Sequence, residues 1–199
     1  MKLLRRSSDR FIRICAIGLF MYVGALLPAS AQSPTPPGRI AIMWINHLDF
    51  LPGDGTVSVS SFPGPTAVVH GLSGLVIRSG FLGDTGEGGV NKVVEKGLQV
   101  PPGFLITGVR VCYELANPRS FITQIRLAQV QDPPSSALVL LDDGTDLTNP
   151  GPICVNSAST PIDPSLGAVR LSLRVNFGGP GDEIVLRAVA LHLLRRPGP

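Results

Sequence analysis

The stretch Ala168-Val169-Arg170-Leu171-Ser172-Leu173-Arg174-Val175-Asn176-Phe177 decides the fold class of this chain. Its apolar side chains occupy every second position, so five of them share one face of an extended backbone and the residues between them share the other. This period of two predicts a β-strand with one buried face and one solvent-exposed face. The glycine-rich segment 178–182 then predicts a turn. Residues 183–194 resume as a strand that is apolar on both faces, which places it at the centre of a sheet.

Shorter apolar segments precede this stretch and are separated by glycine and proline. The strand candidates are residues 39–46, 56–60, 67–78, 90–100, 108–115, 121–131 and 138–141. Among them, 108–115 and 121–131 alternate most clearly, and 138–141 is a short buried run. The 23 glycines and 19 prolines leave little room for long helices. We therefore predict an all-β chain, an antiparallel β-sandwich of the jelly-roll or immunoglobulin-like type, with a single domain over residues 39–194.

One segment in the second half of the domain has a recognisable pattern. In Val100-Pro101-Pro102-Gly103-Phe104-Leu105-Ile106-Thr107-Gly108-Val109-Arg110-Val111-Cys112-Tyr113, a Pro-x-Gly loop leads through apolar residues and Thr into x-Val-x-Val-x-Tyr. Together with Ile125-Arg126-Leu127 and Leu171-Ser172-Leu173-Arg174-Val175, it resembles a loose group of uncharacterised secreted bacterial β-sandwich proteins. The resemblance covers the C-terminal half of the domain. It implies the sandwich fold and no activity.

The N-terminus has the organisation of a secretory signal peptide. Its basic residues are Lys2, Arg5, Arg6, Arg10 and Arg13. The apolar run 14–27 follows, and Ala29-Ser30-Ala31 supplies the small residues of a cleavage site before Gln32. The run has 14 residues, fewer than the ~20 that a spanning helix needs. We predict that residues 1–31 are removed and that the mature protein is secreted or periplasmic, without a membrane span.

Charge limits the partners of the mature chain. The signal segment holds five of the 17 Lys and Arg residues and one of the 14 Asp and Glu residues, which leaves 12 cations against 13 acids. A nucleic-acid partner needs a cationic surface, so none is expected. Residues 32–38 are rich in proline and predict an extended linker, and 195–199 predict a solvated C-terminal tail.

The mature chain has two cysteines, Cys112 and Cys154. In an oxidising compartment such a pair is expected to form a disulfide, whereas a structural zinc site needs four ligands at short spacing. Cys112 alternates with Arg110, and Cys154 alternates with Asn156, away from the apolar side of each segment. We predict a disulfide on the outer face or at an edge of the sandwich.

The candidate catalytic residues lack the partners that catalysis needs. Ser73 lies in Gly71-Leu72-Ser73-Gly74-Leu75, but a nucleophile elbow requires glycine where this chain has leucine. His47 and His70 have no acid or nucleophile at a motif-defined spacing, and His192 is equally isolated. We therefore predict that the protein is not an enzyme and that it uses no cofactor.

The acidic segment Asp142-Asp143-Gly144-Thr145-Asp146 has two interpretations. Asp-Gly is a strong turn signal, and this interpretation is preferred. The alternative is a structural Ca²⁺ held by Asp142, Asp143 and Asp146, although their spacing does not match an EF-hand.

Two functions remain open. The first is a non-catalytic structural or binding protein at the cell envelope, whose partner is another protein or an envelope component. The alternative is a carbohydrate-binding module, with or without the structural calcium. Sugar sites use exposed aromatic rings, and Trp44 is the one tryptophan in the chain. Because Trp44 lies in the apolar run 40–45, we expect it in the core, which favours the first function.

Overall fold

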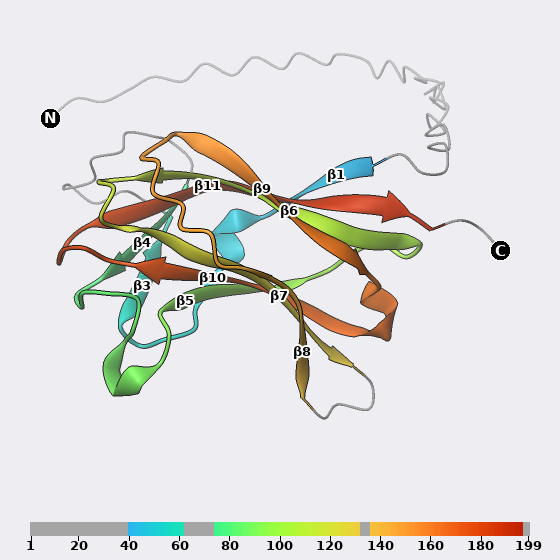
Figure 1. Ribbon diagram of the computed structural model, residues 1–199, viewed down its shortest axis with the longest axis horizontal. Coiled ribbons are helices and arrows are strands. Elements are labelled where there is room, and N and C mark those ends of the chain that lie inside the picture. The colour runs from blue at the N-terminus through green and yellow to red at the C-terminus, as the bar shows by residue number, and fades with distance from the viewer. Residues whose placement is uncertain (1–39, 62–73, 132–135, 197–199) are drawn as a thin grey trace, which may run out of the picture. The chain divides into compact units, whose positions relative to one another are not determined.

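Two antiparallel β-sheets face each other in the computed structural model, which describes residues 40–61, 74–131 and 136–196 (Figure 1). Sheet A has the strand order β3 (Val57–Ser60), β4 (Leu75–Ser79), β11 (Glu183–Arg195), β6 (Phe104–Leu115) and β9 (Ile153–Ile162), with β1 (Ile40–Ile45) also paired to β11. Sheet B has the order β2 (Leu51–Pro52), β5 (Val93–Leu98), β10 (Gly167–Asn176), β7 (Phe121–Gln131) and β8 (Ala137–Asp143). The predicted all-β sandwich is confirmed.

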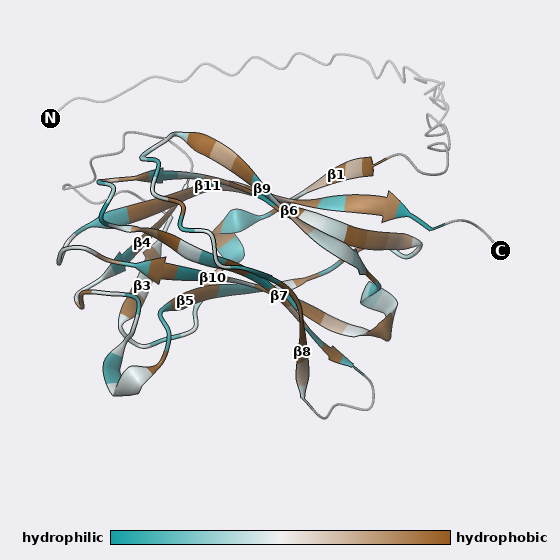
Figure 2. Cartoon of the chain, in the orientation of Figure 1, coloured by the Kyte–Doolittle hydropathy of each residue, from teal (hydrophilic) through white to brown (hydrophobic). Residues whose placement is uncertain are grey.

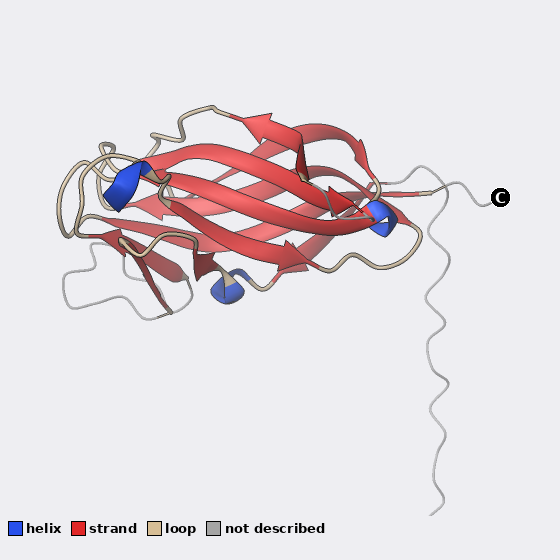
Figure 3. Cartoon of the chain, turned by 90° about the horizontal axis from the view of Figure 1, so that it is seen from below, coloured by secondary structure: helices blue, strands red, loops and turns tan. Residues whose placement is uncertain are grey.

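Helical structure in the described residues is confined to three single turns in the connections (Figure 3). These are η1 (His47–Asp49), η2 (Glu87–Gly89) and η3 (Pro164–Leu166). None of the helices in these residues is long and apolar enough to cross a membrane. From β4 onward, successive strands mostly alternate between the sheets, as in a double-sheet jelly roll.

The alternation in the sequence builds the core. On β10, Val169, Leu171, Leu173 and Val175 are buried, and they pack with the inward residues of β6, β7 and β11 in one hydrophobic cluster. Figure 2 shows apolar and polar segments alternating along these strands. Because side chains of a strand point to opposite faces in turn, the polar residues of β10 lie on the outer face of sheet B. There Arg170 pairs with Glu95 at 3.1 Å.

Strand β11 lies at the centre of sheet A, as its two apolar faces predict. One edge pairs with β6 over most of the strand's length. The other edge is shared, because β4 pairs with residues 183–186 and β1 pairs with residues 189–194. Strand β1, the first strand in the chain, thereby lies in the same sheet as β6 and β9.

Two details differ from the sequence expectations. Residues 138–141 are not a buried run, because β8 is an edge strand with Leu138 and Val139 about half exposed. Arg195 belongs to β11 and Arg196 forms an ion pair with Asp163, although both were expected in the C-terminal tail, of which residues 197–199 lie outside the described residues. The predicted signal peptide 1–31, the linker 32–38 and the residues His70 and Ser73 lie outside the described residues.

Candidate functional site

The outer face of sheet A carries a row of four residues that crosses four strands. Trp44 on β1 is opposite Ala190 on β11, Ala190 is opposite Arg110 on β6, and Arg110 is opposite Asn156 on β9. With neighbouring strands ~4.8 Å apart, this cross-strand row extends roughly 14 Å over the sheet. We call these four residues the Trp44 row.

The expectation that Trp44 lies in the core is wrong: its side chain is 59% exposed. In β1 the residues that pack against the core are Ala41, Met43 and Ile45, so Ile42 and Trp44 point outward. The run 40–45 is apolar at every position, and such a run does not reveal which alternate set faces inward. Pairing with β11 decides the matter, because it sets which face of β1 meets the core.

A second row on the same face lies beside the Trp44 row and contains two small residues, Gly108 and Ala158. The neighbouring row consists of Ile42, His192, Gly108 and Ala158 on the same four strands. A Cβ atom at Gly108 would lie 2.6 Å from the backbone oxygen of Ser157 and 3.4 Å from Nδ1 of His192. Glycine is therefore required at this position by the close approach of β9, and the His192 ring lies next to it.

Arg110 and Asn156 form the polar end of the Trp44 row. Arg110 donates a hydrogen bond from Nη1 to Oδ1 of Asn156 at 3.2 Å. The next pair on the same face of these two strands is Cys112 and Cys154, joined by a disulfide with a Cα–Cα distance of 3.9 Å. Since β9 is an edge strand and both cysteines face outward, the predicted position of the disulfide is confirmed.

The disulfide holds the register in which Arg110 meets Asn156. It fixes β9 against β6 at the next pair on this face, and among the described strands β9 pairs with β6 alone. A depression of about 220 Å³ lies beside it, lined by Cys112, Tyr113, Pro152, Ile153, Cys154 and Arg187. The face therefore combines an exposed aromatic ring, a fixed polar pair and a hollow.

Removal of the disulfide is expected to destabilise the domain by about 4 kcal/mol, because the bridge closes a loop of 42 residues. The double variant C112S/C154S should therefore show a lower midpoint in urea unfolding than the oxidised protein. Reduced wild-type protein is the control and should unfold at the midpoint of the variant. Unfolding of oxidised protein and variant at the same urea concentration would contradict this prediction.

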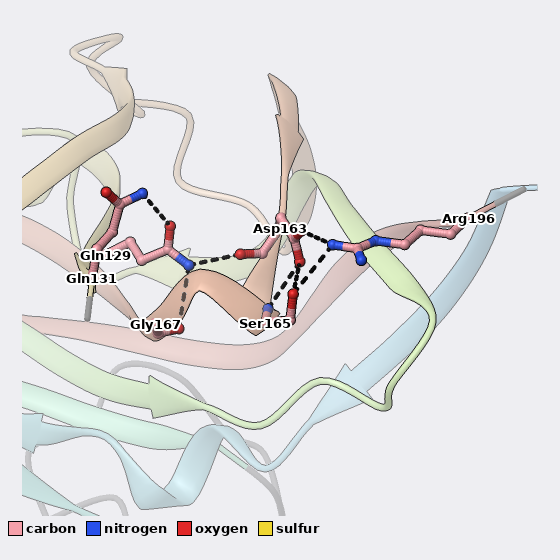
Figure 4. Close-up of polar contacts among 6 residues, drawn as sticks. All are labelled: Gln129, Gln131, Asp163, Ser165, Gly167 and Arg196. Carbon is pink, nitrogen blue, oxygen red and sulfur yellow. Dashed lines mark hydrogen bonds and ion pairs between the residues drawn. The ribbon is translucent and has the colours of Figure 1, made fainter. Parts of the chain in front are cut away.

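A second concavity, of about 430 Å³, lies where the β5–β6 connection, η3 and the end of β11 meet. Figure 4 shows that its polar groups bind one another. The Asp163 carboxylate accepts from the backbone nitrogen and the hydroxyl of Ser165, at 2.9 and 2.7 Å, and forms an ion pair with Arg196. Gln129 donates to the backbone oxygens of Asp163 and Gly167. These contacts hold the connections together and leave few polar atoms for a ligand.

The acidic segment lies on sheet B, away from the Trp44 row. Asp142 accepts hydrogen bonds from Gln124 and Arg126, at 2.6 and 3.1 Å. Asp143 accepts from the Ser157 hydroxyl at 2.6 Å, and this contact lowers the pKa of its carboxyl group. In residues 40–61, 74–131 and 136–196 no three His, Cys, Asp or Glu side chains form a group suited to a metal ion, and Asp146 joins no such group.

The two histidines in the described residues, His47 and His192, lie in different parts of the fold. His192 lies in the row beside Trp44, whereas His47 lies half-buried in η1, where burial lowers its pKa below the usual 6.5. Its Nε2 is buried and makes no hydrogen bond within the described residues. The structure thus brings His192, and not His47, to the candidate site.

His47 should make stability depend on pH. Its folded-state pKa is lowered, so the unfolded chain binds a proton first as the pH falls. The contribution of neutral His47 is therefore complete above pH ~6.5 and is lost as the pH falls through the folded-state pKa. The difference in unfolding free energy between wild type and His47→Gln should shrink from pH 7.5 to pH 5. Parallel profiles over this range would contradict the assignment.

No family model matches the sequence, and no curated protein sequence matches it. Among solved structures, the CBM22-1 xylan-binding domain of Paenibacillus barcinonensis Xyn10C superposes with a TM-score of 0.52 at 9% identity, covering 81% of this chain and 98% of that chain. The two share a fold. Similarity at this identity establishes the sandwich architecture alone.

Two further solved structures match at lower TM-scores. The C-terminal family 22 carbohydrate-binding module of Clostridium thermocellum Xyn10B is 12% identical, with 79% of this chain and 87% of that chain covered and a TM-score of 0.39. A family two carbohydrate esterase from Cellvibrio japonicus is 11% identical, with 80% of this chain and 37% of that chain covered and a TM-score of 0.34.

Proposed function

We propose that this protein is an exported, non-catalytic carbohydrate-binding module that holds a polysaccharide along the Trp44 row. The observation that carries the proposal is the exposed Trp44 ring in one cross-strand row with the hydrogen-bonded pair Arg110 and Asn156. Of the two functions considered from the sequence, the carbohydrate-binding alternative is the one that this arrangement favours.

The row offers complementary contacts to a sugar. A pyranose ring has an apolar face of C–H groups and an edge of hydroxyl groups. The indole ring of Trp44 provides a flat apolar surface for the first. The guanidinium of Arg110 and the amide of Asn156 provide donors and an acceptor in fixed planes for the second. Ala190 between them is fully buried, so the groups of the row that can meet a sugar are the side chains of Trp44, Arg110 and Asn156.

The scaffold favours binding without large rearrangement. The four residues stand on paired strands of a sheet, and the Cys112–Cys154 disulfide lies directly beside the polar pair. Rigid support of this kind lowers the entropy lost on binding. The fold itself supports the proposal, since the xylan-binding domain that superposes on this chain has the same sandwich. Export through the predicted signal peptide would bring the protein to extracellular or envelope polysaccharides.

The proposal is tested by retention on insoluble and immobilised polysaccharides. Oxidised protein lacking residues 1–31 is mixed with a panel that includes xylan, β-glucan, galactan, chitin, polygalacturonate and peptidoglycan, and the unbound fraction is measured. We expect at least one polymer to deplete the protein and a soluble form of that polymer to release it. Absence of retention by every polymer would refute carbohydrate binding.

A further inference from the structure

We propose that the Trp44 row selects an acidic polysaccharide, and that Arg110 binds the carboxylate of a uronate unit. This inference rests on the proposed carbohydrate binding and specifies its ligand class. It follows from the charge balance of the row, from the hydrogen bonding of Arg110 and from the distance between Arg110 and Trp44.

Arg110 differs from the arginines that form ion pairs. Six arginines of the described residues pair with carboxylates: Arg78 with Glu183, Arg126 with Asp142, Arg170 with Glu95, Arg174 with Asp84, Arg187 with Glu114, and Arg196 with Asp163. Arg110 instead donates to the neutral amide oxygen of Asn156. Its positive charge is therefore positioned on the surface by a partner that does not neutralise it.

Among the residues that the structure describes, the two rows around Arg110 supply no negative charge. The Trp44 row and the neighbouring row contain no aspartate or glutamate, and the next pair on the same face of β6 and β9 is the disulfide. Glu114 follows on the same face of β6, but it is bound to Arg187 at 2.6 Å. The face between β1 and β9 thus carries a net positive charge at Arg110.

The contact with Asn156 orients the guanidinium for an anion. It engages Nη1 and leaves Nη2 and Nε, which can donate two parallel hydrogen bonds to one carboxylate. This paired geometry is specific to arginine and matches a carboxylate more closely than it matches isolated hydroxyl groups. A neutral sugar would use the same donors singly and would leave the charge unpaired.

The position of Trp44 favours a uronate within a polysaccharide over a free small anion. Only Ala190 separates Trp44 from Arg110, and their backbones are two strand spacings, roughly 10 Å, apart. A ring stacked on Trp44 would place a following unit of the same polymer over Arg110. The site therefore combines ring stacking and carboxylate recognition in one ligand.

The test uses pairs of polymers in which the uronate carboxylate is either charged or neutralised as its methyl ester. Polygalacturonate, alginate and glucuronoxylan are each compared with their methyl-esterified forms by isothermal titration with the oxidised protein. We expect one acidic polymer to bind at least ten-fold more tightly than its ester. In Arg110→Gln this preference should be lost, so that the acid and the ester bind alike, while the urea midpoint stays near that of wild type.

The control variant is Arg170→Gln, which removes an exposed arginine from the outer face of sheet B and should keep the ten-fold preference. Arg110→Lys keeps the charge without the paired donors and should retain only part of it. If acidic and esterified polymers bind wild type equally and Trp44→Ala weakens both, carbohydrate binding stands and the acidic selectivity is refuted. If Arg110→Gln and Arg170→Gln weaken acidic polymers equally and Trp44→Ala weakens none, attraction is non-specific and both proposals fail. If no polymer of either form binds, both proposals also fail.

Discussion

Replacement of Lys92 by methionine should lower the free energy of unfolding by roughly 3–5 kcal/mol, the largest effect on stability that we expect from a single substitution, because three buried acceptors lose a charged donor. Lys92 is fully buried, and its ammonium donates to the backbone oxygens of Phe81, Leu82 and Gly83 at 2.6, 2.8 and 2.9 Å. Methionine fills a similar volume but donates no hydrogen bond. Three carbonyl groups of the β4–β5 connection would then lose their buried partner.

The surroundings of Lys92 show why the charge is tolerated there. Burial lowers the pKa of Lys92, while the negative charges of Asp54 and Asp84 act in the opposite direction. The ring of Phe177 lies with its centroid 5.8 Å from the ammonium and adds a cation–π contact. The Lys92 ammonium therefore holds the β4–β5 connection against the end of sheet B.

Urea unfolding of Lys92→Met measures the effect, with Lys96→Met as the matched control. Lys96 pairs with the exposed carboxylate of Asp49 at 3.0 Å, and such pairs contribute about 0–1 kcal/mol. Unfolding of Lys92→Met within 1 kcal/mol of wild type would show that the three contacts contribute little. Faster proteolysis within residues 81–90 of the folded variant would locate the loss in the β4–β5 connection.

Substitution of Trp44 by alanine should weaken polysaccharide binding at least 30-fold, the largest effect on function. A tryptophan that supplies the stacking surface of a binding site commonly contributes about 2 kcal/mol or more, which corresponds to this ratio. Because the side chain is 59% exposed and lies outside the core, the unfolding free energy should change by less than about 0.5 kcal/mol. Affinity electrophoresis through a gel containing the bound polymer measures the loss.

Two variants distinguish stacking from a general loss of apolar surface. Trp44→Phe keeps an aromatic ring and should recover part of the affinity. Phe81→Ala removes an aromatic ring of comparable exposure, 50%, from the β4–β5 connection and should migrate as wild type. Equal mobility of Trp44→Ala and wild type in the polymer gel would remove Trp44 from the site.

The sandwich could be predicted from the sequence because its strands show distinct patterns of apolar residues, some strictly alternating and some continuous. The stretch 168–177 has a strict period of two and becomes β10 with its apolar residues buried. Residues 183–194 are apolar on both faces and become the central strand β11. The runs 40–45 and 138–141 are also apolar, but they form strands with exposed large side chains, and only the pairing of the strands reveals this.

Only part of the candidate site could be predicted from the sequence. Alternation placed Arg110 with Cys112 and Asn156 with Cys154, and the expected disulfide implies that these segments are neighbours. Antiparallel pairing about that bridge would have put Arg110 opposite Asn156. No comparable signal connects β1 to β11, which are about 150 residues apart in the chain, so the position of Trp44 beside them required the structure.

The central claim is that a polysaccharide covers Trp44, and the fluorescence of this residue tests it most directly because the chain has no other tryptophan. Oxidised protein is titrated with a polymer that retains it, and emission and quenching by acrylamide are recorded. The proposed site predicts a shift of the emission maximum to shorter wavelength and a lower quenching constant as the polymer saturates the protein. Saturating polymer that leaves both the emission and the quenching of Trp44 unchanged would contradict it.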